Sequence, residues 1–154
     1  MRTGATHLPR DPRLEKAAVR EKVESIIGPT RQEASRRPDW LVSTNRRTSV
    51  FITFSKIEQL FYDVNEADVA DWRQFPRSFV IFVLGSADSS LVMPVEALEK
   101  HVLKRIRPKE RGNFKLHIVD TGRYRFDEVS YFDATPYHNN FWLLSETEHV
   151  PSAT

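Results

Sequence analysis

Apolar positions recur at helical spacing between Leu14 and Ile27, and this pattern predicts an amphipathic helix. Asp11 followed by Pro12 is typical of an N-cap with proline in the first helical turn. Gly28 and Pro29 end the pattern. The polar residues from 30 to 37 are expected to form a loop.

Short runs of β-branched and aromatic residues follow, separated by turn residues. They predict strands at residues 40–44, 50–57 and 60–64. The run 79–84 is apolar at every position, as in a central strand that is covered on both faces. Further strands are expected at residues 91–93 and 114–119, the second with the polar and apolar alternation of a half-buried strand.

Two more helices are predicted. Asn65 can cap a short acidic helix that runs to Trp72, and Pro94 stands at the start of a helix that reaches about Ile106. In the second helix, the inward side chains are expected to be Leu98, Val102, Leu103 and Ile106. The aromatic stretch 133–144 is expected to fold back, either to cover a sheet edge or to offer aromatic and amide groups to nucleic acid.

These elements predict one α/β domain over residues 11–144. The expected architecture is a single mixed central sheet flanked by helices. Residues 1–10 and 145–154 are expected to be disordered tails.

Composition narrows the class of protein. The 154 residues include no cysteine, which excludes disulfides, thiolate metal sites and cysteine nucleophiles. No apolar run approaches the roughly 20 residues that span a bilayer. The polar start of the chain does not have the apolar core of a secretory signal. We therefore expect a cytoplasmic protein with no membrane partner.

The net charge is only +2, but the charges are unevenly distributed. Residues 1–57 carry twelve Lys and Arg against six acids, and residues 104–111 are again strongly basic. Such asymmetry is typical of a surface that contacts phosphates, although solvated faces would give the same counts. The candidate contacts are Arg46, Arg47, Arg107, Lys109 and Arg111.

One layout points to specific chemistry. Pro38-Asp39 opens one predicted strand and Ser55-Lys56 closes the next. With the order of elements between residues 12 and 120, this layout resembles the PD-(D/E)XK nuclease superfamily, which has the restriction-endonuclease-like fold.

The resemblance implies a protein that acts on DNA by Mg²⁺-dependent phosphodiester hydrolysis. Asp39 matches the first acid and Lys56 the lysine that serves the attacking water. Phe54 occupies the position of the second acid, and a phenyl ring cannot bind Mg²⁺. The implied metal ligands are then Asp39 with Glu58 or Glu24. A homodimer and a restriction or defence setting are further implications of the resemblance.

The incomplete motif leaves a second hypothesis open. The same fold without its metal pair would be a non-catalytic module that binds nucleic acid or a protein. In that case Asp39 only begins a strand, Lys56 is a surface lysine, and Glu58 and Glu24 are solvated. His117 lies on a predicted strand, where it either points into a cleft or is half-exposed with a structural role. No histidine spacing or glycine-rich loop points to another metal or nucleotide site.

Overall fold

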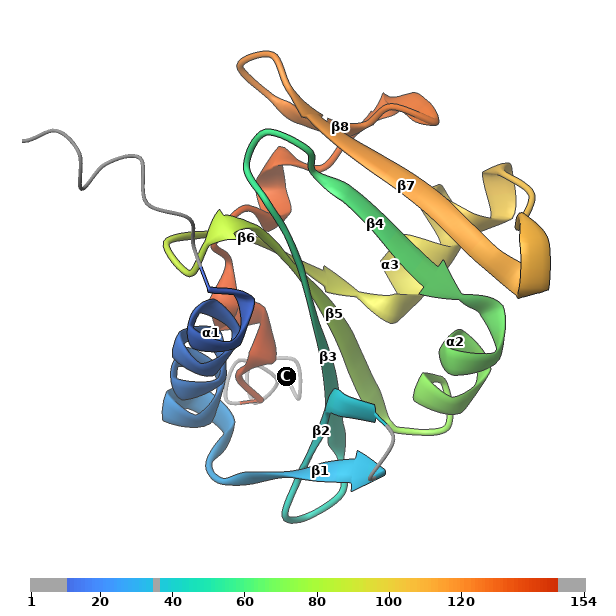
Figure 1. Ribbon diagram of the computed structural model, residues 1–154. Helices are drawn as coiled ribbons and strands as arrows, with labels where there is room; N and C mark the ends of the chain where they lie inside the picture. Colours follow the sequence, from blue (N-terminus) through green and yellow to red (C-terminus); the bar gives the residue numbers. More distant parts are fainter. Residues whose placement is uncertain (1–10, 35–36, 147–154) are drawn as a thin grey trace, which may run out of the picture.

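The structure of the protein is a computed structural model that describes residues 11–34 and 37–146. Three layers pack together (Figure 1). Helix α1 (Pro12–Ile27) covers one face of a five-stranded sheet. A four-stranded sheet covers the other face, together with α2 (Glu66–Trp72) and α3 (Val95–His101).

The five-stranded sheet has the strand order β1-β2-β3-β5-β6. Its strands are β1 (Thr30–Ala34), β2 (Arg37–Ser43), β3 (Thr48–Ser55), β5 (Arg77–Ser86) and β6 (Ser89–Pro94). The β3–β5 pair is parallel and the other pairs are antiparallel, so the sheet is mixed. The predicted α/β class and the mixed sheet are therefore confirmed.

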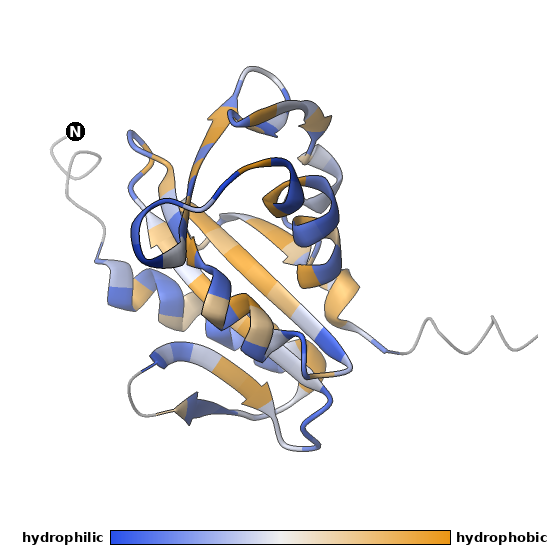
Figure 2. Cartoon of the chain, turned by 90° about the vertical axis from the view of Figure 1, so that its right-hand side faces the viewer, coloured by the Kyte–Doolittle hydropathy of each residue, from blue (hydrophilic) through white to orange (hydrophobic). Residues whose placement is uncertain are grey.

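Successive side chains of the central strands point to opposite faces of the sheet and so contribute to two separate hydrophobic cores. In β5, Phe82 contributes to the core beneath the second sheet, whereas Ile81 and Val83 contribute to the core beneath α1. Val19 and Val23 of α1 complete the latter and are fully buried. Figure 2 shows this central strand as a hydrophobic band through the molecule. The prediction that it is covered on both faces is confirmed.

The prediction of a single sheet was wrong. A second sheet has the order β4-β7-β8-β9, made of β4 (Phe61–Asn65), β7 (Asn113–Asp120), β8 (Tyr124–Phe126) and β9 (Val129–Asp133). Strand β4 belongs to this sheet through its pairing with β7, and its Tyr62 and Val64 face the core while the alternate residues stay outside. Burial also places the Tyr62 hydroxyl where it donates to the Val83 carbonyl of the central sheet at 2.7 Å.

Two predicted boundaries also need correction. Residues 30–34 form β1 rather than a loop, because backbone pairing with β2 tolerates polar side chains on an edge strand. Helix α3 ends at His101, and a 3₁₀ turn (Leu103–Arg105) follows a break at Val102, where φ is −123°. The predicted inward side chains of this segment are confirmed.

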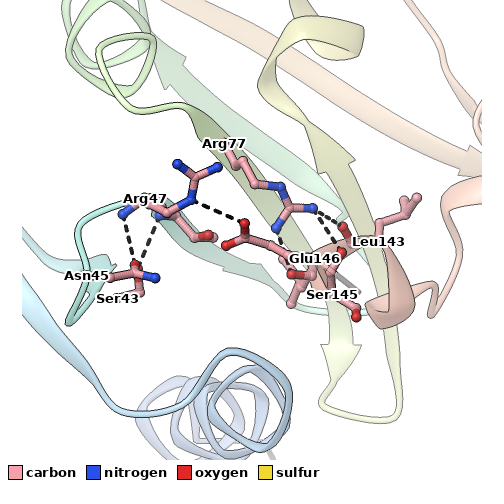
Figure 3. A network of polar contacts seen from close by, with 9 residues as sticks. Ser43, Asn45, Arg47, Arg77, Leu143, Ser145 and Glu146 are labelled. Atoms are coloured by element: carbon pink, nitrogen blue, oxygen red, sulfur yellow. Dashed lines mark hydrogen bonds and ion pairs between the residues drawn. The ribbon is translucent and has the colours of Figure 1, made fainter. Parts of the chain in front are cut away.

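The C-terminal segment folds back as predicted, and it contacts the edge strand β6 through His138 and Asn139 rather than through Trp142. The Asn139 amide N–H donates to the Ser90 carbonyl of β6 at 2.7 Å. Farther along, the Arg77 guanidinium donates to the carbonyls of residues 143–145, and Arg47 pairs with Glu146 at 3.2 Å (Figure 3). Of the predicted tails, residues 1–10 and 147–154 lie outside the described residues. Among the described helices, none is long and apolar enough to cross a membrane.

Candidate nucleic-acid interface

The basic segment, residues 100–111, runs from the last turn of α3 to the loop before β7. Val102 and Leu103 are buried, and Ile106 packs against the same core. These apolar anchors fix the path of the chain and leave the cationic side chains outside. Those exposed cations are Lys100, Lys104, Arg105, Arg107, Lys109 and Arg111.

Within the described part of the chain, none of these six cations has a carboxylate within 4.0 Å. Many cations elsewhere are paired. Arg37, for example, lies 3.1 Å from Asp68 and 2.7 Å from Asp71. The only acid inside the basic segment is Glu110. The segment therefore carries a positive charge that the fold does not neutralise locally.

A hydrogen-bonded turn positions the end of the basic segment. Arg111 and Gly112 have positive φ angles of 59° and 77°, which reverse the chain into β7. The Lys109 amide donates to the Asn113 carbonyl at 2.7 Å and closes this turn. The Asn65 side-chain amide donates to the Arg111 carbonyl at 3.0 Å. The turn is thereby attached to the start of α2.

Gly112 is favoured at this turn for two reasons. Its φ of 77° is in the left-handed region that disfavours other residues. A Cβ at this position would also lie 2.7 Å from the Glu66 carboxylate. The left-handed φ therefore favours glycine here, and another residue would also require the exposed Glu66 side chain to move.

Arg46 and Arg47 lie at the β2–β3 turn and are both paired. Arg46 forms two hydrogen bonds with the Glu33 carboxylate, at 3.0 and 2.7 Å, and lies over the Phe75 ring. The hydrogen bonds from Arg46 lower the pKa of Glu33 below its usual value. Arg47 is paired with Glu146. Of the predicted phosphate contacts, only Arg107, Lys109 and Arg111 belong to the unpaired basic segment.

The structure does not bring Asp39 and Lys56 together. The β2–β3 register pairs Trp40 with Phe51, which places Asp39 opposite Ile52. Lys56 is four residues farther along, about 13 Å at the usual rise of a strand. Asp39 instead accepts a hydrogen bond from Lys16 of α1 at 2.7 Å. Lys56 is exposed at the first position after β3.

The other two predicted metal ligands lie at opposite ends of β3. Glu24 accepts hydrogen bonds from the amide and hydroxyl of Thr30, both at 2.7 Å, and these bonds lower its pKa. Thr30 pairs with Ser43, next to the start of β3. Glu58 lies in the exposed turn that follows the end of β3.

These positions do not fit a shared Mg²⁺ site. Glu24 is held by Thr30, which pairs with Ser43, four residues along β2 from Asp39. Glu58 is six residues beyond Ile52, the residue opposite Asp39. Phe54 packs partly buried against the α1 core. Within residues 11–34 and 37–146, no group of three or more His, Asp or Glu side chains could hold a metal ion.

The phosphate contacts predicted from the sequence omitted three of the six exposed cations in the basic segment. Lys100, Lys104 and Arg105 are exposed beside the predicted contacts. The signal was present, because cations recur on the outward side of the predicted helix while Val102, Leu103 and Ile106 face inward. Comparison with known proteins found no matching family model, no similar curated protein and no similar solved structure.

Proposed function

We propose that this protein binds nucleic acid, without cleaving it, through the phosphate contacts of the basic segment. One observation carries the proposal: the six exposed cations of the basic segment have no carboxylate partner among the described residues. Unpaired Lys and Arg side chains release counterions from phosphates and so favour binding to a polyanion.

The proposal corresponds to the non-catalytic hypothesis from the sequence. Hydrolysis by the nuclease mechanism needs the first acid, a second carboxylate and the lysine near one metal ion. The contact between Asp39 and Lys16, and the four-residue offset between Lys56 and the residue opposite Asp39, favour binding over hydrolysis. Phosphate contacts alone do not distinguish DNA from RNA.

Salt-dependent binding to a fluorescein-labelled 20-nucleotide strand tests the proposal. We expect affinity to fall steeply between 50 and 200 mM salt. In the variant with Arg107→Gln, Lys109→Gln and Arg111→Gln, we expect a shallower slope of log affinity against log salt. The slope should decrease by roughly one for each phosphate that the variant no longer neutralises.

Arg46→Gln with Arg47→Gln is the matched control, because it removes two cations that already have carboxylate partners. We expect it to change the slope much less than the triple variant. No binding by the unmodified protein at 50 mM salt would overturn the proposal. Equal slopes for the unmodified protein and the triple variant would overturn it as well.

A further inference from the structure

The outward side of the second sheet begins next to the basic segment. Strands β4 and β7 lie side by side (Figure 1), and β7 starts directly after the turn at Arg111. Their register pairs the outward residues of the two strands. We call this surface the β4–β7 face; it consists of Phe61, Asp63, Asn65, Asn113, Lys115 and His117.

An exposed aromatic ring lies on this face. Phe61 is 63% exposed, although the neighbouring Tyr62 is buried in the core. The Phe61 ring stacks on His117, with ring centroids 4.3 Å apart and an interplanar angle of 26°. A large aromatic side chain this open to solvent contributes little to the core.

The Phe61–His117 platform is held in place before any partner binds. The Phe61 amide N–H donates to the buried Ser55 hydroxyl at 3.1 Å, which ties β4 to the end of β3. On the other strand, the His117 amide donates to the Glu128 carboxylate at 3.0 Å. Both backbones are therefore held by hydrogen bonds, and the two rings already lie stacked on each other.

The β4–β7 face carries one cation and one carboxylate, Lys115 and Asp63, and the carboxylates of Asp127 and Glu128 lie beside His117. Asp63 lies between the platform and the basic segment, but Lys115 pairs with it at 3.0 Å. Asp127 lies 3.9 Å from His117 Nδ1, at the far end of the face. From Asn113 to His117 the face extends for about 13 Å at the usual rise of a strand. A bound strand could therefore contact cations at one end and the aromatic platform at the other.

We infer that the β4–β7 face binds single-stranded nucleic acid, with one base stacked on the Phe61–His117 platform. This inference rests on the proposed function and specifies its substrate. Bases in a duplex are stacked on one another and present only their edges, whereas an unpaired base can offer its π face to an aromatic ring. Stacking on aromatic side chains tolerates any base, so we expect weak sequence preference.

Fluorescence anisotropy with labelled 12-nucleotide strands at 50 mM salt tests the inference. The probes are oligothymidylate and an abasic strand with the same number of phosphates. We expect the unmodified protein to bind oligothymidylate about tenfold more tightly. We expect Phe61→Leu to lose this difference and to bind the abasic strand unchanged, because leucine keeps an apolar contact with His117 but has no aromatic face. Phe61→Tyr should retain the difference.

Trp142→Ala is the matched control, since Trp142 is also 62% exposed but lies on the segment that packs against α1. We expect it to bind both strands like the unmodified protein. Equal affinity of the unmodified protein for both strands would overturn the inference and leave the proposed function intact. An unchanged preference in Phe61→Leu would do the same. No binding to either strand would overturn both.

Discussion

Asn65 and Arg111 are joined by a hydrogen bond from the Asn65 side-chain amide to the Arg111 carbonyl, at 3.0 Å. The same amide donates to the Asn113 side chain at 2.9 Å, while the Asn65 side-chain oxygen caps α2 by accepting from the Ala67 amide. One side chain therefore both starts a helix and holds the end of the basic segment. This double role can be separated by substitution.

Asn65→Ser should keep the helix cap and release the basic segment. Serine caps helices about as well as asparagine, but its hydroxyl cannot replace both amide donors. We expect the free energy of unfolding to fall by about 1 kcal/mol, because these hydrogen bonds no longer form. Urea unfolding measures this value, and hydrogen exchange at residues 109–113 should increase. Unchanged exchange there would contradict the role assigned to Asn65.

Gly112→Ala should destabilise the protein by more than the backbone strain alone. A left-handed conformation costs an ordinary residue about 1 kcal/mol, and here the added methyl group would also meet the Glu66 carboxylate. Gly122→Ala is the control, because Gly122 has a φ of 97° but no atom within 4 Å of the added Cβ. We expect the lower urea midpoint for Gly112→Ala. Equal urea midpoints, or a lower midpoint for Gly122→Ala, would show that the contact with Glu66 costs nothing.

Asp39→Asn tests whether Asp39 has a structural role. Its ion pair with Lys16 is partly exposed, so we expect a loss of about 0.5 kcal/mol in the free energy of unfolding. Lys56→Ala should leave stability unchanged, because Lys56 is exposed. Asp39→Asn should not alter nucleic-acid binding by more than about twofold, since Asp39 belongs neither to the basic segment nor to the β4–β7 face. Mg²⁺-dependent cleavage that disappears in both variants would instead support the nuclease hypothesis.

Arg77→Lys should loosen the C-terminal segment. The Arg77 guanidinium donates to the carbonyls of Leu143, Leu144 and Ser145, and an ammonium group cannot reproduce this fork. We expect the free energy of unfolding to fall by about 1–2 kcal/mol. Arg47→Lys, which affects only an exposed ion pair with Glu146, should cost less than about 0.5 kcal/mol. Urea unfolding of the two variants gives the comparison.

Asp133→Asn should remove a pH-dependent contribution that Asp133, at the end of β9, makes to the free energy of unfolding. Hydrogen bonds from the Thr135 side chain and amide, followed by those from Arg123, lower the pKa of Asp133 to about 2. A carboxylate with a lowered pKa stabilises the fold above its usual pKa near 4, and this contribution is lost as the pH falls towards 2. The urea midpoints of Asp133→Asn and the unmodified protein should therefore differ at pH 7, and the difference should shrink as the pH falls from about 4 through 2. A constant difference would contradict the assignment.

Local patterns in the sequence were sufficient to predict most of the helices and strands. The capping role of Asn65 and the end of its helix at Trp72 follow from local chemistry, and the structure confirms both. The fully apolar run in β5 required cover on both faces, and two cores provide it. These features depend on neighbouring residues and on alternation, which a single sequence displays.

Pairing between distant segments could not be predicted in the same way. Strand β1 is polar and is stabilised by its backbone bonds to β2, so its side chains carry no signal. The partner of β4 is β7, about 50 residues later, and not its neighbour β3. The ion pairs of Arg46 with Glu33 and of Lys16 with Asp39 also depend on the fold. Only the positions of these ion pairs showed which cations of the described residues have no carboxylate partner.

The route of the chain through β4 links the two sheets. Strands β3 and β5 are parallel neighbours, yet the segment that connects them forms β4 and α2 of the other layer. A fragment that stops before β7 would leave β4 without the strand it pairs with. We therefore expect a fragment that ends at residue 112 to be unfolded throughout, without a stable five-stranded sheet.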